Sequence, residues 1–294
     1  MPLINIAAEN ADLAEDKKRK GVFFVKTRII SAVVLLPVLI CLVVWGSFPL
    51  QVAMGVLGIL AMYEYYRVFS PQQYLLHGVG YLFTVIYVIW IHPITERYFP
   101  IFTSVFLVVL LILSVIDHEK VKPMDCFTTF FGFFYGCFLL SHVYLVREFA
   151  YGKLLVWLIF LAAFGCDTGA YFTGMACGKH KLIPTLSPKK TVEGAVGGVI
   201  TATVLSIVYG VIIGNYYTIE GVNLLLLCGL TGFIGSFLAQ IGDLAASAMK
   251  RSTGIKDFGK LIPGHGGVLD RFDSVILTAP AVYYVMYCLI DFHG

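Results

Sequence analysis

Residues 99–117 read FPIFTSVFLVVLLILSVID, and no charged side chain occurs in this stretch before its final residue, Asp117. An apolar stretch of about 20 residues is long enough to cross a lipid bilayer as a helix. The chain contains nine such runs, near residues 28–46, 50–68, 77–92, 99–117, 127–146, 154–172, 194–214, 223–242 and 272–290. They predict an all-α, polytopic integral membrane helical bundle with about nine transmembrane helices.

The composition indicates the same class. Hydrophobic residues make up 59% of the 294 positions, charged residues only 13%, and the mean hydropathy is +0.85, which is too apolar for a soluble domain. Residues 1–26 are polar and of mixed charge, so we expect a disordered cytoplasmic N-terminal segment. Residues 27–294 are expected to form a single transmembrane domain.

The positions of the basic residues predict the orientation in the membrane, because Lys and Arg near span ends are retained on the cytoplasmic side. With nine spans and the N-terminus inside, 18 of the 21 basic residues fall on the cytoplasmic side. Two long polar loops, about 173–193 and 243–271, then share that side. Since the basic residues follow this topology rule, the net charge of +3 gives no indication of a nucleic-acid partner.

The second loop begins with a pattern of charged and polar residues at helical spacing. Asp243, Ser247, Lys250 and Arg251 fall along one face of a helix, where they can bind a metal ion and a phosphate together. The alternative is an interfacial helix whose cations reach toward the membrane surface. That alternative explains the two cations but not an acid at the end of an apolar span, where burial without a partner is costly.

A glycine-rich turn follows in the same loop, at residues 263–267, and its backbone amides can approach a ligand closely. Asp270, Asp273 and Ser274 then stand three and four residues apart at the start of the last apolar run. A carboxylate on that helical face can complete a metal site. Alternatively, the two acids only cap the helix and offset its dipole.

The first loop contains adjacent lysines, Lys189 and Lys190, before a glycine-rich helix start. Lysines beside a helix N-terminus attract phosphate, although paired lysines also occur anywhere on a cytoplasmic face. Asp167, at the end of the sixth apolar run, is a further site candidate or one half of a hydrogen-bonded pair with Thr168. Glu64 is a weaker candidate, because Arg67 lies one helical turn away and can pair with it.

These residues together resemble the signature of the CDP-diacylglycerol synthases, also called phosphatidate cytidylyltransferases. That signature is a Ser followed by Lys-Arg, then Lys-Asp, a Pro-x-His-Gly-Gly turn and Asp-Arg-x-Asp. This chain has Ser247, Lys250-Arg251, Lys256-Asp257, Pro263, His265-Gly266-Gly267, Asp270-Arg271 and Asp273. The blocks at 167–171 and 187–194 also resemble the family, and residues 1–26 lie outside the resemblance.

The resemblance implies transfer of the cytidylyl group of CTP to phosphatidic acid, giving CDP-diacylglycerol and pyrophosphate. Residues 27–294 would then be the catalytic domain, Mg2+ is required with room for a second metal ion, and the chain forms a homodimer. Carried over by motif position, the catalytic residues are Asp243, Asp270, Lys250 and Arg251; the substrate-binding residues are Ser187, Lys189, Lys190, Thr191, Ser247, His265, Gly266, Gly267 and Arg271; the metal ligands are Asp243, Asp270, Asp167 and Asp273. The compact length favours a bacterial plasma (inner) membrane, with the active site on the cytoplasmic face.

Two other classes of function stay open. A secondary transporter would use Asp167 and Asp243 as coupling sites, but it predicts acids near the bilayer centre rather than at one face. The other class is another CTP-dependent membrane lipid enzyme, such as a polyprenol or phytol kinase or an archaeal-lipid cytidylyltransferase. It fits the position of the charged residues better than a transporter does. Product analysis separates these classes, because a kinase releases CDP and a cytidylyltransferase releases pyrophosphate.

Overall fold

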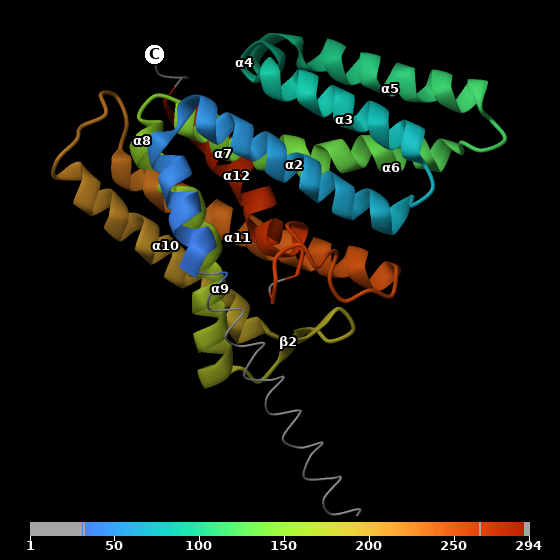
Figure 1. The fold of residues 1–294 in the computed structure, drawn as a ribbon. Coiled ribbons are helices and arrows are strands. Elements are labelled where there is room, and N and C mark those ends of the chain that lie inside the picture. The colour runs from blue at the N-terminus through green and yellow to red at the C-terminus, as the bar shows by residue number, and fades with distance from the viewer. Residues whose placement is uncertain (1–30, 32, 265, 291–294) are drawn as a thin grey trace, which may run out of the picture.

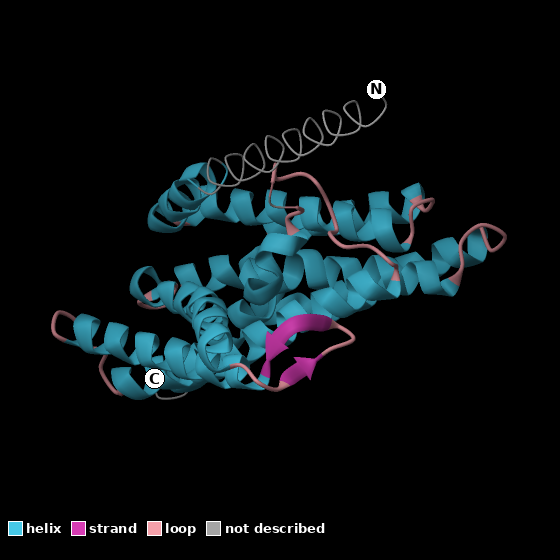
Figure 2. Cartoon of the chain, turned by 90° about the horizontal axis from the view of Figure 1, so that it is seen from below, coloured by secondary structure: helices cyan, strands magenta, loops and turns pink. Residues whose placement is uncertain are grey.

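The computed structural model describes residues 31, 33–264 and 266–290, and this part of the chain is almost entirely helical (Figures 1 and 2). A helix over Val33–Trp45 comes first. The elements that follow are α2 (Ser47–Phe69), α3 (Tyr74–Ile89), α4 (Ile91–Pro93), the π-helical turn η1 (Ile94–Tyr98), α5 (Phe99–Ile116), α6 (Pro123–Phe133), the π-helical turn η2 (Phe134–Phe138), α7 (Leu139–Glu148), α8 (Gly152–Leu155), α9 (Trp157–Cys177), the strands β1 (Lys181–Ile183) and β2 (Ser187–Thr191), α10 (Val192–Gly214), α11 (Leu224–Ser252) and α12 (Leu269–Ile290).

Within the described residues, each of the nine predicted apolar runs lies on one or more helical elements, and the predicted helical membrane class is confirmed. In the part of the chain that the structure describes, seven helices or runs of consecutive helical elements are long and apolar enough to cross a membrane: Ser47–Phe69, Ile91–Ile116, Pro123–Glu148, Gly152–Cys177, Val192–Gly214, Leu224–Ser252 and Leu269–Ile290. The helices Val33–Trp45 and Tyr74–Ile89 are apolar but shorter. The chain is therefore a multi-pass membrane protein, and a count of about nine spans stays a prediction.

Small residues bring the helices of the C-terminal half close together. A Cβ atom added to Gly169 of α9 would overlap Thr201 of α10, and one added to Gly242 of α11 would overlap the carbonyl oxygen of Asp273 in α12. Glycine at such points lets membrane helices approach closely. The Gly242 contact holds α11 and α12 together at the level of their acidic residues.

The N-terminal half forms a second group of helices around α2. A Cβ atom on Gly58 of α2 would press on Cys137 of η2, and one on Gly132 of α6 would overlap the ring of Tyr66. Helix α12 contacts both α7 and α11, so it joins the two groups (Figure 1). The prediction of one domain over residues 27–294 is not tested by this packing, and residues 1–26 lie outside the described residues.

The predicted polar loop at 173–193 contains a small antiparallel hairpin of β1 and β2, with Lys181 opposite Thr191 (Figure 2). The sequence does not predict it, because strands this short carry no alternation of apolar and polar residues. Glu193 at the start of α10 accepts the backbone N–H of His180, which closes the base of the hairpin. The hairpin is thereby anchored to α10 and reaches α11.

Helix α11 continues as one helix past the predicted end of its apolar run at residue 242, to Ser252. The predicted helical segment from Asp243 to Arg251 is confirmed. An ion pair between Lys190 of β2 and Asp243 also brings the two polar loops to the same end of the bundle, as predicted.

Candidate active site

The loop between α11 and α12, residues 253–268, is held by a carboxylate from a distant helix. Glu64 of α2 is 2% exposed, and its two oxygens accept the backbone N–H groups of Val268 and Leu269 at 3.0 Å each. Such N–H groups at a helix start have no partner within their own helix, and the positive end of the helix favours a negative charge. Glu64 therefore caps α12.

Glycine and an arginine complete this anchor. A Cβ atom on Gly259 or Gly267 would overlap the Glu64 carboxylate, so only glycine leaves room for it. Arg67, which the sequence pairs with Glu64, donates instead from Nη2 to the carbonyl oxygen of Phe258 at 2.8 Å. Two side chains of α2 thus fix the loop from one side.

Asp270, in the first turn of α12, fixes the loop from the other side. Its Oδ2 accepts the backbone N–H groups of Phe258 at 2.8 Å and Gly267 at 3.0 Å, and its Oδ1 accepts from Nζ of Lys250 at 2.9 Å. The Lys250 ammonium also lies over the ring of Phe258, 5.6 Å from the centroid. Asp270 is therefore a buried organiser of the loop, and both of its oxygens are already engaged.

A second set of contacts joins the hairpin, α9, α11 and α12. Lys190 pairs with Asp243, and the two side chains are 28% and 26% exposed, so the pair is open to a ligand. Asp167 of α9 accepts a hydrogen bond at 3.0 Å from the hydroxyl of Ser274 in α12. Asp273, one residue earlier, is within electrostatic range of Asp243 and Asp167. Three of the four predicted metal ligands, Asp167, Asp243 and Asp273, therefore lie close enough to act on one another.

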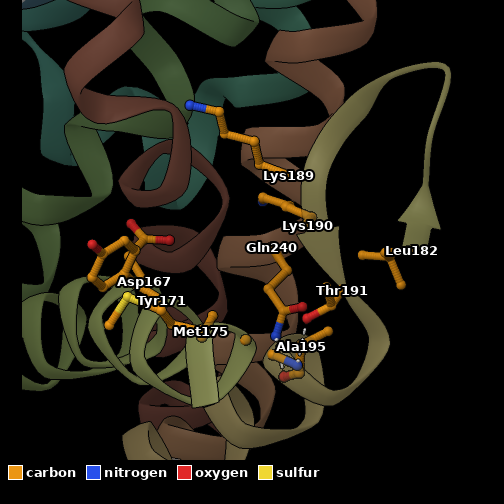
Figure 3. Close-up of a pocket in the computed structure, with 12 residues that line it drawn as sticks. Asp167, Tyr171, Met175, Leu182, Lys189, Lys190, Thr191, Ala195 and Gln240 are labelled. Atoms are coloured by element: carbon orange, nitrogen blue, oxygen red, sulfur yellow. Dashed lines mark hydrogen bonds between the residues drawn. The ribbon is translucent and has the colours of Figure 1, made fainter. Parts of the chain in front are cut away.

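A pocket of about 360 Å³ opens between α9, the hairpin and the start of α10. Figure 3 shows Asp167 and Tyr171 of α9 on one side of it and Lys190 of β2 on another. Gln240 of α11 closes the pocket by donating to the carbonyl oxygen of Ala195 at 2.9 Å. The pocket thus combines apolar walls with a carboxylate and basic groups.

The acidic cluster of Asp167, Asp243 and Asp273 suits Mg2+ in its chemistry. Mg2+ prefers oxygen ligands and is usually held by one or two carboxylates together with substrate phosphates, rather than by a cage of protein ligands alone. No group of three His, Cys, Asp or Glu side chains in the described part of the chain is arranged to hold a metal ion, so an ion here would need substrate phosphates as further ligands. Asp243 and Asp273 fit such an open site, whereas Asp270 already accepts three hydrogen bonds within the protein.

The structure also places the remaining predicted residues. Ser187 and Lys189 lie on β2, and Lys189 lines the pocket. Ser247 and Arg251 lie on α11, Arg271 is exposed in the first turn of α12, and Thr191 caps α10 by accepting the N–H of Gly194 at 3.1 Å. Gly266 has a φ of +91°, a conformation that favours glycine. His265 lies outside the described residues.

Glu64 is the residue whose role sequence reasoning missed. Its assignment to Arg67 rested on their helical spacing, but the structure gives each of them a backbone partner in the loop that carries the signature. A glutamate inside an apolar run of a membrane protein is itself a signal, because its burial requires a partner. That signal was present in the sequence and indicates a role beyond a local ion pair.

We expect replacement of Asp270 by Asn to lower stability. The NH2 group of Asn would face an N–H group that now donates a hydrogen bond to the carboxylate. The free energy of unfolding should fall by about 1–3 kcal/mol, the cost of leaving a buried donor unsatisfied. Thermal unfolding in detergent measures this change. Asp257→Asn, at an exposed position of the same loop, is the control and should stay within about 0.5 kcal/mol of the wild type. Equal stability of both variants would contradict the anchoring role.

Comparison with known proteins gives a family and relatives. A family model described as "Cytidylyltransferase family" matches residues 26–289. The chain is 31% identical over 295 residues to a phosphatidate cytidylyltransferase of Haemophilus influenzae, covering 90% of this chain and 99% of that protein. It is 32% identical over 275 residues to one of Bacillus subtilis, covering 89% and 97%. An Escherichia coli protein named "Uncharacterized protein YnbB" is 43% identical over 138 residues, or 47% of this chain and 44% of that protein.

Proposed function

The chain belongs to the cytidylyltransferase family and is a nucleotidyltransferase, and on this premise we propose that it transfers the cytidylyl group of CTP to phosphatidic acid. The products are CDP-diacylglycerol and pyrophosphate. The observation that carries this proposal is the meeting of Lys190, Asp243 and Asp273 at one end of a membrane bundle. There, Asp167 and Lys190 line a pocket of about 360 Å³, which we assign to the phosphates of the nucleotide and of the lipid head group.

The reaction joins two anions, and the site has to offset their repulsion. CTP and phosphatidate together carry about six negative charges near neutral pH. Lys189 and Lys190 of the hairpin, Arg251 of α11 and Arg271 of α12 are the groups that we assign to phosphate contacts. We assign Lys250, whose ammonium group is held by a hydrogen bond to Asp270, to a phosphate contact as well. The cations hold the two substrates together while they react, so positioning and charge supply most of the catalysis.

The chemical step needs no strong general base. An oxygen of the phosphatidate phosphate is already ionised, so it attacks the α-phosphorus of CTP directly. A bond forms between that oxygen and the α-phosphorus, and the bond from the α-phosphorus to the bridging oxygen breaks in line with it. The bonding electrons leave with pyrophosphate. The residues of the site orient the two phosphates and stabilise the departing charge.

We assign Mg2+ to the acidic cluster, with Asp243 and Asp273 as ligands and Asp167 beside them. When bound, the ion supplies positive charge that screens the phosphates from one another and stabilises the leaving pyrophosphate. The resemblance also places Asp270 among the ligands, but its three accepted hydrogen bonds support a different role, the positioning of Lys250 and the loop. A second ion stays a prediction of the resemblance.

The site lies at the end of the bundle where the basic residues gather, and we therefore propose that it faces the cytoplasm. The diacyl chains of the substrate stay in the leaflet while its head group meets CTP at the membrane surface. Relatives from bacteria support a bacterial plasma (inner) membrane as the location. The homodimer implied by the resemblance stays a prediction.

Product analysis tests the proposal. We expect the purified protein, in detergent micelles containing phosphatidate, CTP and Mg2+, to release one pyrophosphate for each CDP-diacylglycerol formed. A chelator should stop the reaction, and added Mg2+ should restore it. Release of CDP in place of pyrophosphate would instead assign a CTP-dependent kinase. Turnover of an archaeal-type ether lipid with no turnover of phosphatidate would assign a related cytidylyltransferase.

A further inference from the structure

The hydroxyl of Tyr135 is buried and has no hydrogen-bond partner within the described residues. The residue is only 4% exposed. A buried polar group without a partner costs free energy, and most such groups in proteins are satisfied. Only two other side-chain atoms of the described chain share this condition, Nε2 of His142 and Oγ of Ser206. An unpaired buried hydroxyl therefore needs an explanation.

The backbone around Tyr135 is unusual as well. Tyr135 lies in η2, a π-helical turn between α6 and α7. Such turns occur frequently at functional sites, because they change the direction of a side chain within an otherwise regular helix. The turn is held in place, since a Cβ atom on the neighbouring Gly136 would press on the backbone nitrogen of Met62 in α2. The Tyr135 ring also stacks on Phe131, with centroids 5.6 Å apart.

The surroundings of the hydroxyl distinguish it from the other two atoms. The turn η2 that carries Tyr135 packs against α12, the helix of Asp270 and Asp273, and Asp273 and Asp243 are within electrostatic range of the Tyr135 side chain, so this side chain lies on the side of the acidic cluster. The ring of His142 packs among aromatic rings, among them that of Phe138. Ser206 packs against Gly232 in the contact between α10 and α11. Only the hydroxyl of Tyr135 lies near groups that the proposed reaction uses.

We propose that the Tyr135 hydroxyl donates a hydrogen bond to a phosphate oxygen of a substrate bound at the acidic cluster. This inference rests on the proposed function, and it adds to the site a residue that lies outside the signature segments. A phenol is a neutral donor and a phosphate is an anionic acceptor, so the bond is charge-assisted and stronger than one between neutral groups. The phosphate belongs either to CTP or to phosphatidate, and both supply the same acceptor.

Replacement of Tyr135 by Phe separates this role from packing. The ring stays and only the hydroxyl leaves, and removal of an unsatisfied buried group is close to neutral or stabilising for the free protein. We therefore expect an unfolding temperature equal to or above that of the wild type, together with weaker binding of a phosphate ligand by about tenfold or more. Ser206→Ala is the matched control, because it removes another buried hydroxyl without a partner and should leave ligand binding unchanged.

Calorimetry with CTP alone and titration with phosphatidate micelles alone give the two arms of the test. A loss in the CTP arm assigns the bond to the nucleotide, and a loss in the lipid arm assigns it to the lipid phosphate. Binding in both arms within twofold of the wild type would overturn the inference, because the hydroxyl would then make no hydrogen bond to a phosphate of either substrate. A lower unfolding temperature of the free Tyr135→Phe protein would also overturn it, since the hydroxyl would then have a partner in the protein. If the wild type binds both substrates but forms no CDP-diacylglycerol, the proposed reaction fails, and the binding arms still decide the role of Tyr135.

Discussion

Replacement of Asp243 by Asn is expected to lower the rate of cytidylyl transfer by at least about a hundredfold. Asn has nearly the same shape but lacks the charge that pairs with Lys190 and that, in the proposed site, binds Mg2+. The side chain is 26% exposed, so the loss of the ion pair should change stability by less than about 1 kcal/mol. The rate of pyrophosphate release measures the effect, and thermal unfolding verifies that the variant is folded.

Asp117→Asn is the matched control for this prediction. Asp117 pairs with Lys120 at 3.7 Å in the connection after α5, so the substitution removes the same kind of surface ion pair away from the site. We expect this variant to keep the wild-type rate. An Asp243→Asn protein that retained more than half of the wild-type rate would remove Asp243 from the catalytic residues and leave the family assignment intact.

Replacement of Glu64 by Gln is expected to reduce both stability and activity. The carboxylate accepts two backbone N–H groups at the start of α12, and an amide can accept with only one of its two terminal atoms. The NH2 group of the introduced glutamine would face an N–H donor, and the close packing of Gly259 and Gly267 against this side chain leaves no space for it to move away. We expect a loss of about 2–4 kcal/mol in the free energy of unfolding, because hydrogen bonds to a buried charge are among the stronger ones.

The activity should fall with it, because the loop that Glu64 holds carries the turn at Gly266, and the helix start that Glu64 caps carries Asp270, which binds Lys250. Thermal unfolding and CTP binding measure the two effects. Glu148→Gln is the control: Glu148 also accepts a backbone N–H, from Ser47 at 2.8 Å, at the start of α2 and the end of α7. That variant should leave CTP binding unchanged. If Glu64→Gln bound CTP as tightly as the wild type, the cap would be purely structural.

Much of the fold could be predicted from local patterns. In the described part of the chain the apolar runs are helical, because a membrane span has to satisfy its backbone hydrogen bonds internally, and a continuous run of apolar residues is enough to specify that. The continuation of α11 through Arg251 followed from helical spacing in the same way. The hairpin of β1 and β2 could not be predicted, because contacts with Glu193 hold it and its strands have no pattern of their own.

The candidate site, too, could be predicted only where its residues are close in sequence. The signature between Ser247 and Asp273 could be read directly, because its residues are close in sequence. Nothing local, however, distinguishes the roles of Asp270 and Asp243. The structure gives Asp270 three hydrogen bonds, two from the loop and one from Lys250 of α11. It leaves Asp243 paired with a lysine of the hairpin, and only packing determines which of the two acids is open to a ligand.

The sequence by itself determined the helical membrane class, the family and the segments that carry charge, because these depend on composition and on spacing within one helix or loop. Tertiary structure alone decided which distant groups meet. Glu64 caps α12, Asp167 accepts from Ser274, and the turn that carries Tyr135 packs against α12, although all three belong to helices remote in the chain from their neighbours. The physical reason is that a buried polar group finds its partner on whichever helix packs against it, and small residues determine which helices pack closely. Spacing along the chain does not predict such a contact.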